Sequence, residues 1–164
     1  MGLNWEEEGV LPKIDVTDEA VIDAPPAEAY KAILDEYAGV TNWFMPILKY
    51  NLRGGMPIRE GSIIDITINP EGRVKSKVSE KMIKLVEAMS IEEEVVGDFV
   101  GNREWTFEPT TEGKTKVQCR FNVRTNRTLF SLFSPFVDIG KVHSDAMQKG
   151  YQALNSYLQE NRTK

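Results

Sequence analysis

The chain has 164 residues, of which 41% are hydrophobic and 27% are charged, and its formal net charge is -5. This length and balance are typical of one globular domain and exclude a disordered chain. The net negative charge argues against a protein that binds the phosphate backbone of nucleic acids, so we expect no DNA or RNA partner.

The first part of the chain predicts an arm followed by a strand. We expect residues 1–12 to form a flexible N-terminal arm and residues 13–162 to form one domain. Apolar side chains on one parity predict a strand at the start of that domain. They are Ile14, Val16, Ala20 and Ile22.

Two short helices are expected after this strand. The prolines of Ala24-Pro25-Pro26 end the strand, and Pro26 suits the first turn of a helix. Residues 27–36 are rich in helix-forming residues, and Gly39 is a typical helix end. A second short helix is predicted over residues 40–44.

Six further segments show the alternation of a strand, separated by short turns. Their alternating residues are Leu48, Tyr50 and Leu52; Ile64, Ile66 and Ile68; Val74, Ser76 and Val78, continuing towards Val86; Ile91, Glu93 and Val95; Arg103, Trp105 and Phe107; and Val117, Cys119, Phe121 and Val123. Short turns between successive strands predict an antiparallel sheet.

The last apolar segment, residues 135–160, predicts a long helix that carries the single histidine. Its apolar face recurs at steps of three and four residues. That face holds Phe136, Ile139, His143, Met147, Gly150, Leu154 and Leu158. Glycine costs about 1 kcal/mol relative to alanine inside a helix, so Gly140 and Gly150 indicate close approach or space beside the helix. We therefore predict an α+β fold, with the helix packed across a curved sheet and a cavity between them.

Two segments resemble a known superfamily. "VIDAPPAEAYKAILDEYAGVTNWFMPIL" resembles the strand-to-helix transition of START/birch-pollen-allergen-like proteins, also called SRPBCC or helix-grip proteins. The matching positions are Ile22, Ala24, Pro25, Glu28, Tyr30, Trp43 and Pro46. "WTFEPTTEGKTKVQCRF" is similar to the penultimate hairpin of these proteins.

The resemblance implies a fold and a range of functions. It implies a helix-grip fold, in which a seven-stranded curved antiparallel sheet wraps around a long C-terminal helix, with two short helices between strands 1 and 2. Members bind lipids, sterols, quinones, polyketides or plant hormones; some are polyketide cyclases or dehydratases, and others assist chaperones. The fold alone does not choose among these functions.

Four polar residues lie on the inward parity of the strands: Ser76, Glu80, Glu93 and Arg103. A tight connection over residues 97–101 would pair Val95 with Arg103, so that Glu93 and Arg103 become diagonal neighbours. An inward charge is costly unless it is paired. Arg103 therefore either pairs with Glu93 or faces a water-filled cavity or an anionic ligand group, and the ion pair is favoured because it satisfies both charges.

His143 has three possible roles: a general base, a hydrogen-bond donor to a ligand, or a core residue. We favour the core residue because the sequence offers no obvious partner. A nucleophilic pair of Cys119 and His143 is conceivable, but a cysteine in the middle of a strand is typical of a small core residue. One histidine and one cysteine do not make the usual zinc site, and glycine-rich phosphate loops are absent, so we expect no metal and no cofactor.

The segment Leu129–Phe136 holds four large apolar residues before its proline, within one short connection. We favour a helical turn packed over the mouth of the cavity. A homodimer contact and a transient membrane contact, the latter aided by Arg120, Arg124 and Arg127, are the alternatives. No stretch is long and apolar enough for an integral membrane segment.

The leading hypothesis is a protein that binds or transports a hydrophobic small molecule, as a monomer or homodimer in the cytoplasm. The expected ligand-binding residues are Tyr50, Ile66, Arg103, Trp105, His143, Met147 and Tyr151. The first alternative is a polyketide cyclase or dehydratase that uses His143 with Glu93 or Arg103. The second is a protein-interaction module using residues 129–136. Catalysis is the less favoured reading, because the sequence demands no inward acid–base pair.

Overall fold

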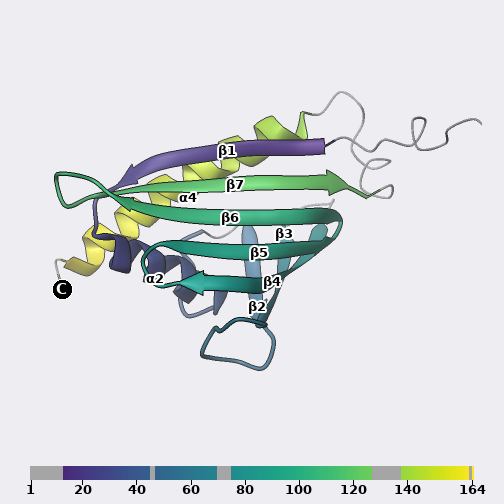
Figure 1. Ribbon diagram of the computed structural model, residues 1–164, viewed down its shortest axis with the longest axis horizontal. Helices are drawn as coiled ribbons and strands as arrows, with labels where there is room; N and C mark the ends of the chain where they lie inside the picture. Colours follow the sequence, from purple (N-terminus) through teal and green to yellow (C-terminus); the bar gives the residue numbers. More distant parts are fainter. Residues whose placement is uncertain (1–12, 45–46, 70–74, 127–137, 163) are drawn as a thin grey trace, which may run out of the picture.

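The computed structural model describes residues 13–44, 47–69, 75–126, 138–162 and 164. Seven strands form one antiparallel sheet in the order β1-β7-β6-β5-β4-β3-β2. The strands are β1 (Lys13–Ile22), β2 (Leu48–Leu52), β3 (Ile63–Ile68), β4 (Ser76–Val86), β5 (Ser90–Gly97), β6 (Phe99–Pro109) and β7 (Thr115–Thr125). The helices are α2 (Pro26–Tyr37) and α4 (Ile139–Arg162). Helix α4 lies against one side of the sheet (Figure 1), which confirms the predicted helix-grip fold.

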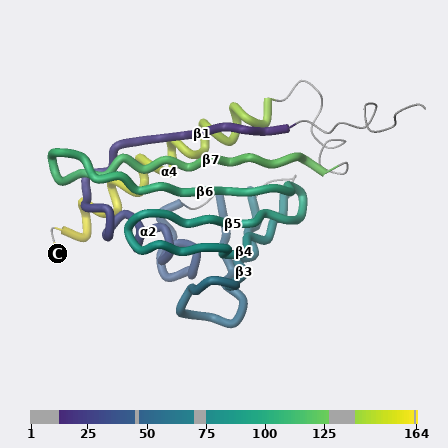
Figure 2. Tube along the Cα trace, in the orientation of Figure 1, coloured from purple at the N-terminus to yellow at the C-terminus, as the bar shows by residue number. Residues whose placement is uncertain are grey.

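The sheet is curved as predicted. Strands β2 and β3 run steeply across the direction of β1 and β7 (Figure 2). The pairing of β4 with β5 shifts register between Met82 and Lys84. An extra residue at such a bulge bends the strand and increases its twist, which helps the sheet to curl around a cavity.

Helix α4 covers the edge of the sheet at β1. Three of its side chains donate to backbone oxygens of β1: Tyr151 Oη to Asp18 at 2.8 Å, Gln148 Nε2 to Glu19 at 3.3 Å, and Asn155 Nδ2 to Val21 at 3.3 Å. An uncovered edge strand is a template for unwanted pairing. These bonds protect the edge and fix the helix, with its single histidine, beside the sheet.

The second predicted helix, over residues 40–44, is wrong, because these residues form a bend and a turn instead. The carboxylate of Glu36 accepts hydrogen bonds from Thr41 Oγ1 at 2.8 Å, Trp43 N at 3.1 Å and Phe44 N at 3.2 Å. The backbone N–H groups of Trp43 and Phe44 therefore bond to a side chain rather than to a preceding turn of helix.

The connection between β5 and β6 is tighter than the sequence predicted. Val95 pairs with Gly101, not with Arg103, and Glu93 lies directly opposite Arg103 rather than diagonal to it. Gly101 therefore belongs to the strand. A Cβ at Gly101 would lie 2.2 Å from the carbonyl oxygen of Asn122, so glycine permits this close pairing of β6 with β7.

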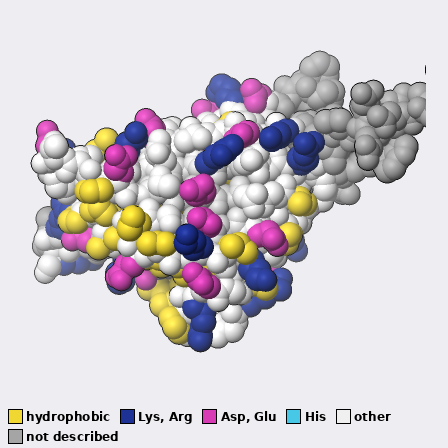
Figure 3. All heavy atoms as spheres, in the orientation of Figure 1, with side chains coloured by type: hydrophobic (Ala, Val, Ile, Leu, Met, Phe, Trp, Pro, Cys, Tyr) yellow, Lys and Arg dark blue, Asp and Glu magenta, His cyan; other side chains and the backbone are white. Residues whose placement is uncertain are grey.

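The outer face of the sheet carries acidic and basic side chains interspersed with hydrophobic ones, and no histidine is visible on it (Figure 3). Two of its basic residues are paired with β1: Arg120 with Asp15 at 2.9 Å and Lys116 with Glu19 at 3.5 Å. None of the helices in the described ranges is long and apolar enough to cross a membrane. The predicted arm (1–12) and the apolar segment 129–136 lie outside the described residues, so the possible roles of that segment stay predictions, as does the cytoplasmic location.

Candidate functional site

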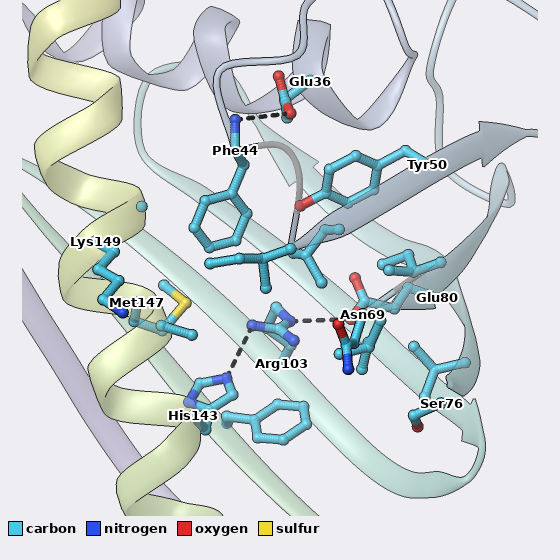
Figure 4. A pocket seen from close by; sticks show the side chains of 18 of the residues that line it. Glu36, Phe44, Tyr50, Asn69, Ser76, Glu80, Arg103, His143, Met147 and Lys149 are labelled. Carbon is cyan, nitrogen blue, oxygen red and sulfur yellow. Dashed lines mark hydrogen bonds and ion pairs between the residues drawn. The ribbon is translucent and has the colours of Figure 1, made fainter. Parts of the chain in front are cut away.

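A cavity of about 560 Å³ lies between α4 and the inner face of the sheet. Figure 4 shows side chains from both layers pointing into it. Most of its lining is apolar, and its described polar side chains include Glu36, Tyr50, Glu80, Arg103 and His143. This is the composition of a small-molecule site, in which apolar walls supply affinity and a few polar groups set orientation.

The structure brings all seven predicted ligand-binding residues to the wall of this cavity. Tyr50 comes from β2, Ile66 from β3, Arg103 and Trp105 from β6, and His143, Met147 and Tyr151 from α4. Of the predicted catalytic candidates, Arg103 and His143 line the cavity and Glu93 does not. Glu93 is therefore poorly placed to touch a bound molecule directly.

Two polar groups in the cavity wall already donate hydrogen bonds to other parts of the protein. The hydroxyl of Tyr151 donates to the Asp18 carbonyl at 2.8 Å, and the indole of Trp105 donates to Tyr37 Oη at 3.0 Å. Tyr50 differs, because its hydroxyl makes no hydrogen bond with any residue that the structure describes. Tyr50 therefore has a polar group that remains available in the cavity.

Arg103 is held by two buried glutamates on neighbouring strands. Its Nε lies 3.0 Å from Glu80 Oε1 and 3.8 Å from Glu93 Oε2, and both glutamate side chains are 0% exposed. The predicted ion pair with Glu93 is present, but Glu80 is the closer partner. Because Glu93 lies opposite Arg103 and Glu80 opposite Val95, three adjacent strands bring these charges together.

The two glutamates share one guanidinium, and the pKa of Glu93 is shifted from its ordinary value. Burial raises the pKa of Glu93 well above its usual range, and so does the negative charge of Glu80. The opposing effects of Arg103 and of the hydrogen bond from Tyr37 Oη, at 3.2 Å, are smaller. Burial therefore favours the protonated form of Glu93, and the closer ion pair of Arg103 is the one with Glu80.

The ring of His143 lies between the cavity and β1. Its Nε2 is 3.5 Å from Arg103 Nη1, as the dashed line in Figure 4 marks, and its Nδ1 is 3.4 Å from Asp18 Oδ2. The ring stacks on Phe121 with centroids 4.3 Å apart. Arginine can only donate, so Nε2 is the acceptor and Nδ1 carries the hydrogen that faces Asp18.

Asp18 is the partner that the sequence reading missed. It is 7% exposed, on the same parity of β1 as Ile14 and Ile22. That parity was a usable signal, because a carboxylate among inward apolar residues needs a partner. The sequence offered no obvious partner for His143, but the histidine contacts this buried carboxylate on β1.

Opposing effects set the charge states of this pair. Burial lowers the pKa of His143, and the nearby Arg103 lowers it further, while the hydrogen bond with Asp18 raises it by less. For Asp18, burial raises the pKa, but hydrogen bonds from His143 and Ser144 outweigh that effect and leave the pKa lowered. Near neutral pH the imidazole is neutral and Asp18 is ionised.

The pKa of His143 gives a direct test of this arrangement. We expect its midpoint, followed by the ring-proton NMR signal, below the ordinary value of 6.5, and lower still in Asp18→Asn. The chain has one histidine, so the assignment is unambiguous. A His143 midpoint at or above 6.5, or an upward shift in Asp18→Asn, would contradict the geometry described here.

Cys119 is not an activated nucleophile. Its thiol is fully buried, and burial raises its pKa to about 12 despite Arg103 Nη1 at 3.4 Å. A nucleophilic cysteine needs an accessible thiolate. The conceivable pair of Cys119 and His143 is thus unsuited to nucleophilic catalysis, in agreement with the prediction of a small core residue.

We expect the folded protein to resist alkylation of Cys119 by iodoacetamide at pH 8, and the protein in 6 M guanidinium chloride to react fully. Intact mass reports the reaction, because Cys119 is the only cysteine. Rapid, complete alkylation of the folded protein would show that this thiol is exposed or activated.

Part of the cavity wall comes from the segment whose backbone bonds to Glu36. Trp43 and Phe44 line the cavity, and Phe44 packs against α4 at Gly150. A Cβ at Gly150 would lie 2.0 Å from the Phe44 ring. The glycine that the sequence singled out therefore makes room for this aromatic ring.

The sequence and the fold were compared with those of known proteins. The sequence model of a family described as "Polyketide cyclase / dehydrase and lipid transport" matches residues 13–159. A comparison of the sequence with curated proteins gave no match.

Solved structures share the fold at low sequence identity. Ara h 8.0201 has a TM-score of 0.66 and 17% identity over 91% of this chain and 99% of its own. Protein Ms6760 from Mycobacterium smegmatis has a TM-score of 0.64 and 13% identity over 90% and 92%. The di-domain ARO/CYC StfQ from the steffimycin biosynthetic pathway has a TM-score of 0.67 and 15% identity, covering 98% of this chain and 55% of its own.

Proposed function

The chain belongs to the polyketide cyclase/dehydrase and lipid transport family, and from that premise we propose that it binds and carries a hydrophobic small molecule inside the cavity between α4 and the sheet. The observation that carries the proposal is the cavity of about 560 Å³, with its apolar wall and few polar groups. A cavity of this kind stays unfilled at a cost in packing, which a bound apolar molecule offsets.

The polar groups of the cavity have a supporting role. Arg103, His143 and the Tyr50 hydroxyl lie among apolar side chains. In such surroundings each hydrogen bond to a ligand constrains its orientation, while the apolar area supplies most of the affinity. We therefore expect one polar end of the ligand near Arg103 and an apolar body against Ile66 and Met147.

A pair of tryptophan variants on α4 tests the proposal. Ala146 lines the cavity, and Gln152 is exposed on the same helix. We expect wild type and Gln152→Trp to bind the neutral dye Nile red, with the dye's emission shifted to the blue, and Ala146→Trp to bind it at least tenfold more weakly. Equal binding by both variants would place the dye elsewhere and contradict the proposal. Circular dichroism checks that each variant is folded.

A cyclase or dehydratase activity is the second candidate, and the contact between His143 and Asp18 favours it. A neutral imidazole with a carboxylate on its far nitrogen is suited to accept a proton from carbon, and Arg103, 3.5 Å away, is suited to stabilise an enolate oxygen. Exchange of the methyl protons of 2-acetylnaphthalene in D2O, followed by NMR, tests it. Protein-accelerated exchange that His143→Gln abolishes would support catalysis, whereas exchange at the buffer rate would argue for a carrier.

A further inference from the structure

The charged side chains around Arg103 restrict the kind of ligand that the cavity can bind. Among the described lining residues, Arg103 and Lys149 are the two that carry a permanent positive charge, and Lys149 is exposed. Arg103 is the buried cation, and it already has Glu80 at 3.0 Å and Glu93 at 3.8 Å. Asp18, which contacts His143, adds a third carboxyl to the same cluster.

A ligand carboxylate would meet an unfavourable environment at this end. It would lose its hydration on entering the cavity, and it would need a cation to compensate. Binding to Arg103 would require it to compete with Glu80, whose side chain is 0% exposed and has no other cation in the described part of the chain. The carboxylate would then lie near the carboxylate of Glu80, which repels it.

An uncharged carbonyl or hydroxyl group of a ligand is not repelled by these carboxylates and loses less hydration free energy on entering the cavity. The contacts of Arg103 Nη1 with Cys119 Sγ, at 3.4 Å, and with His143 Nε2, at 3.5 Å, are long. A ligand oxygen that accepts from this nitrogen, or from the unbonded hydroxyl of Tyr50, gains a hydrogen bond without breaking the ion pair with Glu80.

We propose that the cavity selects uncharged hydrophobic ligands that carry a carbonyl or hydroxyl group and discriminates against carboxylates, because Glu80 already neutralises Arg103. The inference rests on the proposed binding function and names the chemical class of its ligand. It differs from the sequence-based alternative in which Arg103 binds an anionic ligand group.

Three probes with one skeleton test the selection. Isothermal titration at pH 7.5 compares 2-acetylnaphthalene, 2-naphthoate and 2-naphthylmethylammonium, which differ in charge at one end. We expect the ketone to bind at least tenfold more tightly than either ion. A ratio below tenfold for the carboxylate or for the ammonium overturns the inference. This comparison needs no variant, so it does not depend on a substitution that folds.

Glu80→Gln isolates the cause. This variant removes the closer carboxyl partner of Arg103 and leaves Glu93 at 3.8 Å, so 2-naphthoate should gain at least tenfold in affinity. Asp65→Asn is the matched control, because Asp65 lies on the adjacent strand and pairs with the exposed Arg53 at 2.7 Å, outside the cavity. No gain in Glu80→Gln, or an equal gain in Asp65→Asn, would show that Glu80 does not set the selectivity.

The outcomes separate the two proposals. If all three probes bind with similar affinity and Ala146→Trp weakens them all, the cavity binds ligands and only the charge selection fails. If none of the three binds and Nile red also fails to bind, the binding function itself is contradicted, and the selection with it.

Discussion

Replacing Arg103 with methionine is expected to cost about 3–5 kcal/mol of unfolding free energy at pH 8, the usual loss when one partner of a buried ion pair is removed. The variant leaves Glu80 and Glu93 together without a cation, and both side chains are 0% exposed. Urea unfolding followed by circular dichroism measures the loss.

The loss should depend on pH with a defined sign. The pKa of Glu93 is already raised in the folded wild type, and removing Arg103 removes one of the effects that lower it, so the folded state holds this proton more strongly than the unfolded state does. Stability from such raised carboxyls is present at low pH and is lost as pH rises through their folded pKa. We therefore expect a smaller deficit at pH 5 than at pH 8.

Arg53→Met is the matched control for this experiment. Arg53 also pairs with a carboxylate, Asp65, at 2.7 Å, but its side chain is 55% exposed. Exposed ion pairs contribute little to stability, so the control should lose far less than Arg103→Met. Similar losses in Arg103→Met and Arg53→Met, or a deficit that does not change with pH, would contradict a buried cluster organised by Arg103.

Glu36→Gln should be the second most damaging of the changes considered, with a loss of about 2–4 kcal/mol. Its carboxylate accepts three hydrogen bonds from the segment after α2. Hydrogen bonds to a charged group contribute about 1.5–3 kcal/mol each. Glutamine keeps part of this stabilisation through its remaining oxygen. Urea unfolding measures the stability, and Nile red affinity shows whether the displaced Trp43 and Phe44 alter the cavity.

The control for Glu36 is Glu28→Gln on the same helix. Glu28 is exposed, and among the described residues its carboxylate pairs with Arg162 alone, at 3.4 Å, so its substitution should change stability by less than about 0.5 kcal/mol. If Glu36→Gln is no more destabilising than Glu28→Gln, the three hydrogen bonds do not hold the segment that follows α2.

The fold and the lining of the cavity could be predicted from periodicity, because the parity of a strand decides which side chains face inward. That rule placed Glu80, Glu93 and Arg103 on the inner face, where they lie. It also places Asp18 there, but the strand was predicted from its apolar residues alone, and the inward carboxylate was not included among the polar residues of the inner face. For this reason the sequence offered no obvious partner for His143.

Other features depend on contacts that periodicity does not encode. The tight turn between β5 and β6 pairs Glu93 directly with Arg103, whereas the sequence placed Glu93 two residues out of register with it. The predicted helix over 40–44 failed because the Glu36 side chain, several residues earlier, takes up two backbone N–H groups. Both errors come from tertiary contacts that override local preference.

The most direct measurement is an NMR experiment on the protein saturated with 2-acetylnaphthalene, reading intermolecular nuclear Overhauser effects to assigned methyl groups. Binding in the cavity predicts cross-peaks from the naphthyl protons to the methyls of Ile66 and Met147, which line it. Cross-peaks only to the exposed methyls of Val96 and Val100, or none at all at saturation, would contradict a ligand bound between α4 and the sheet.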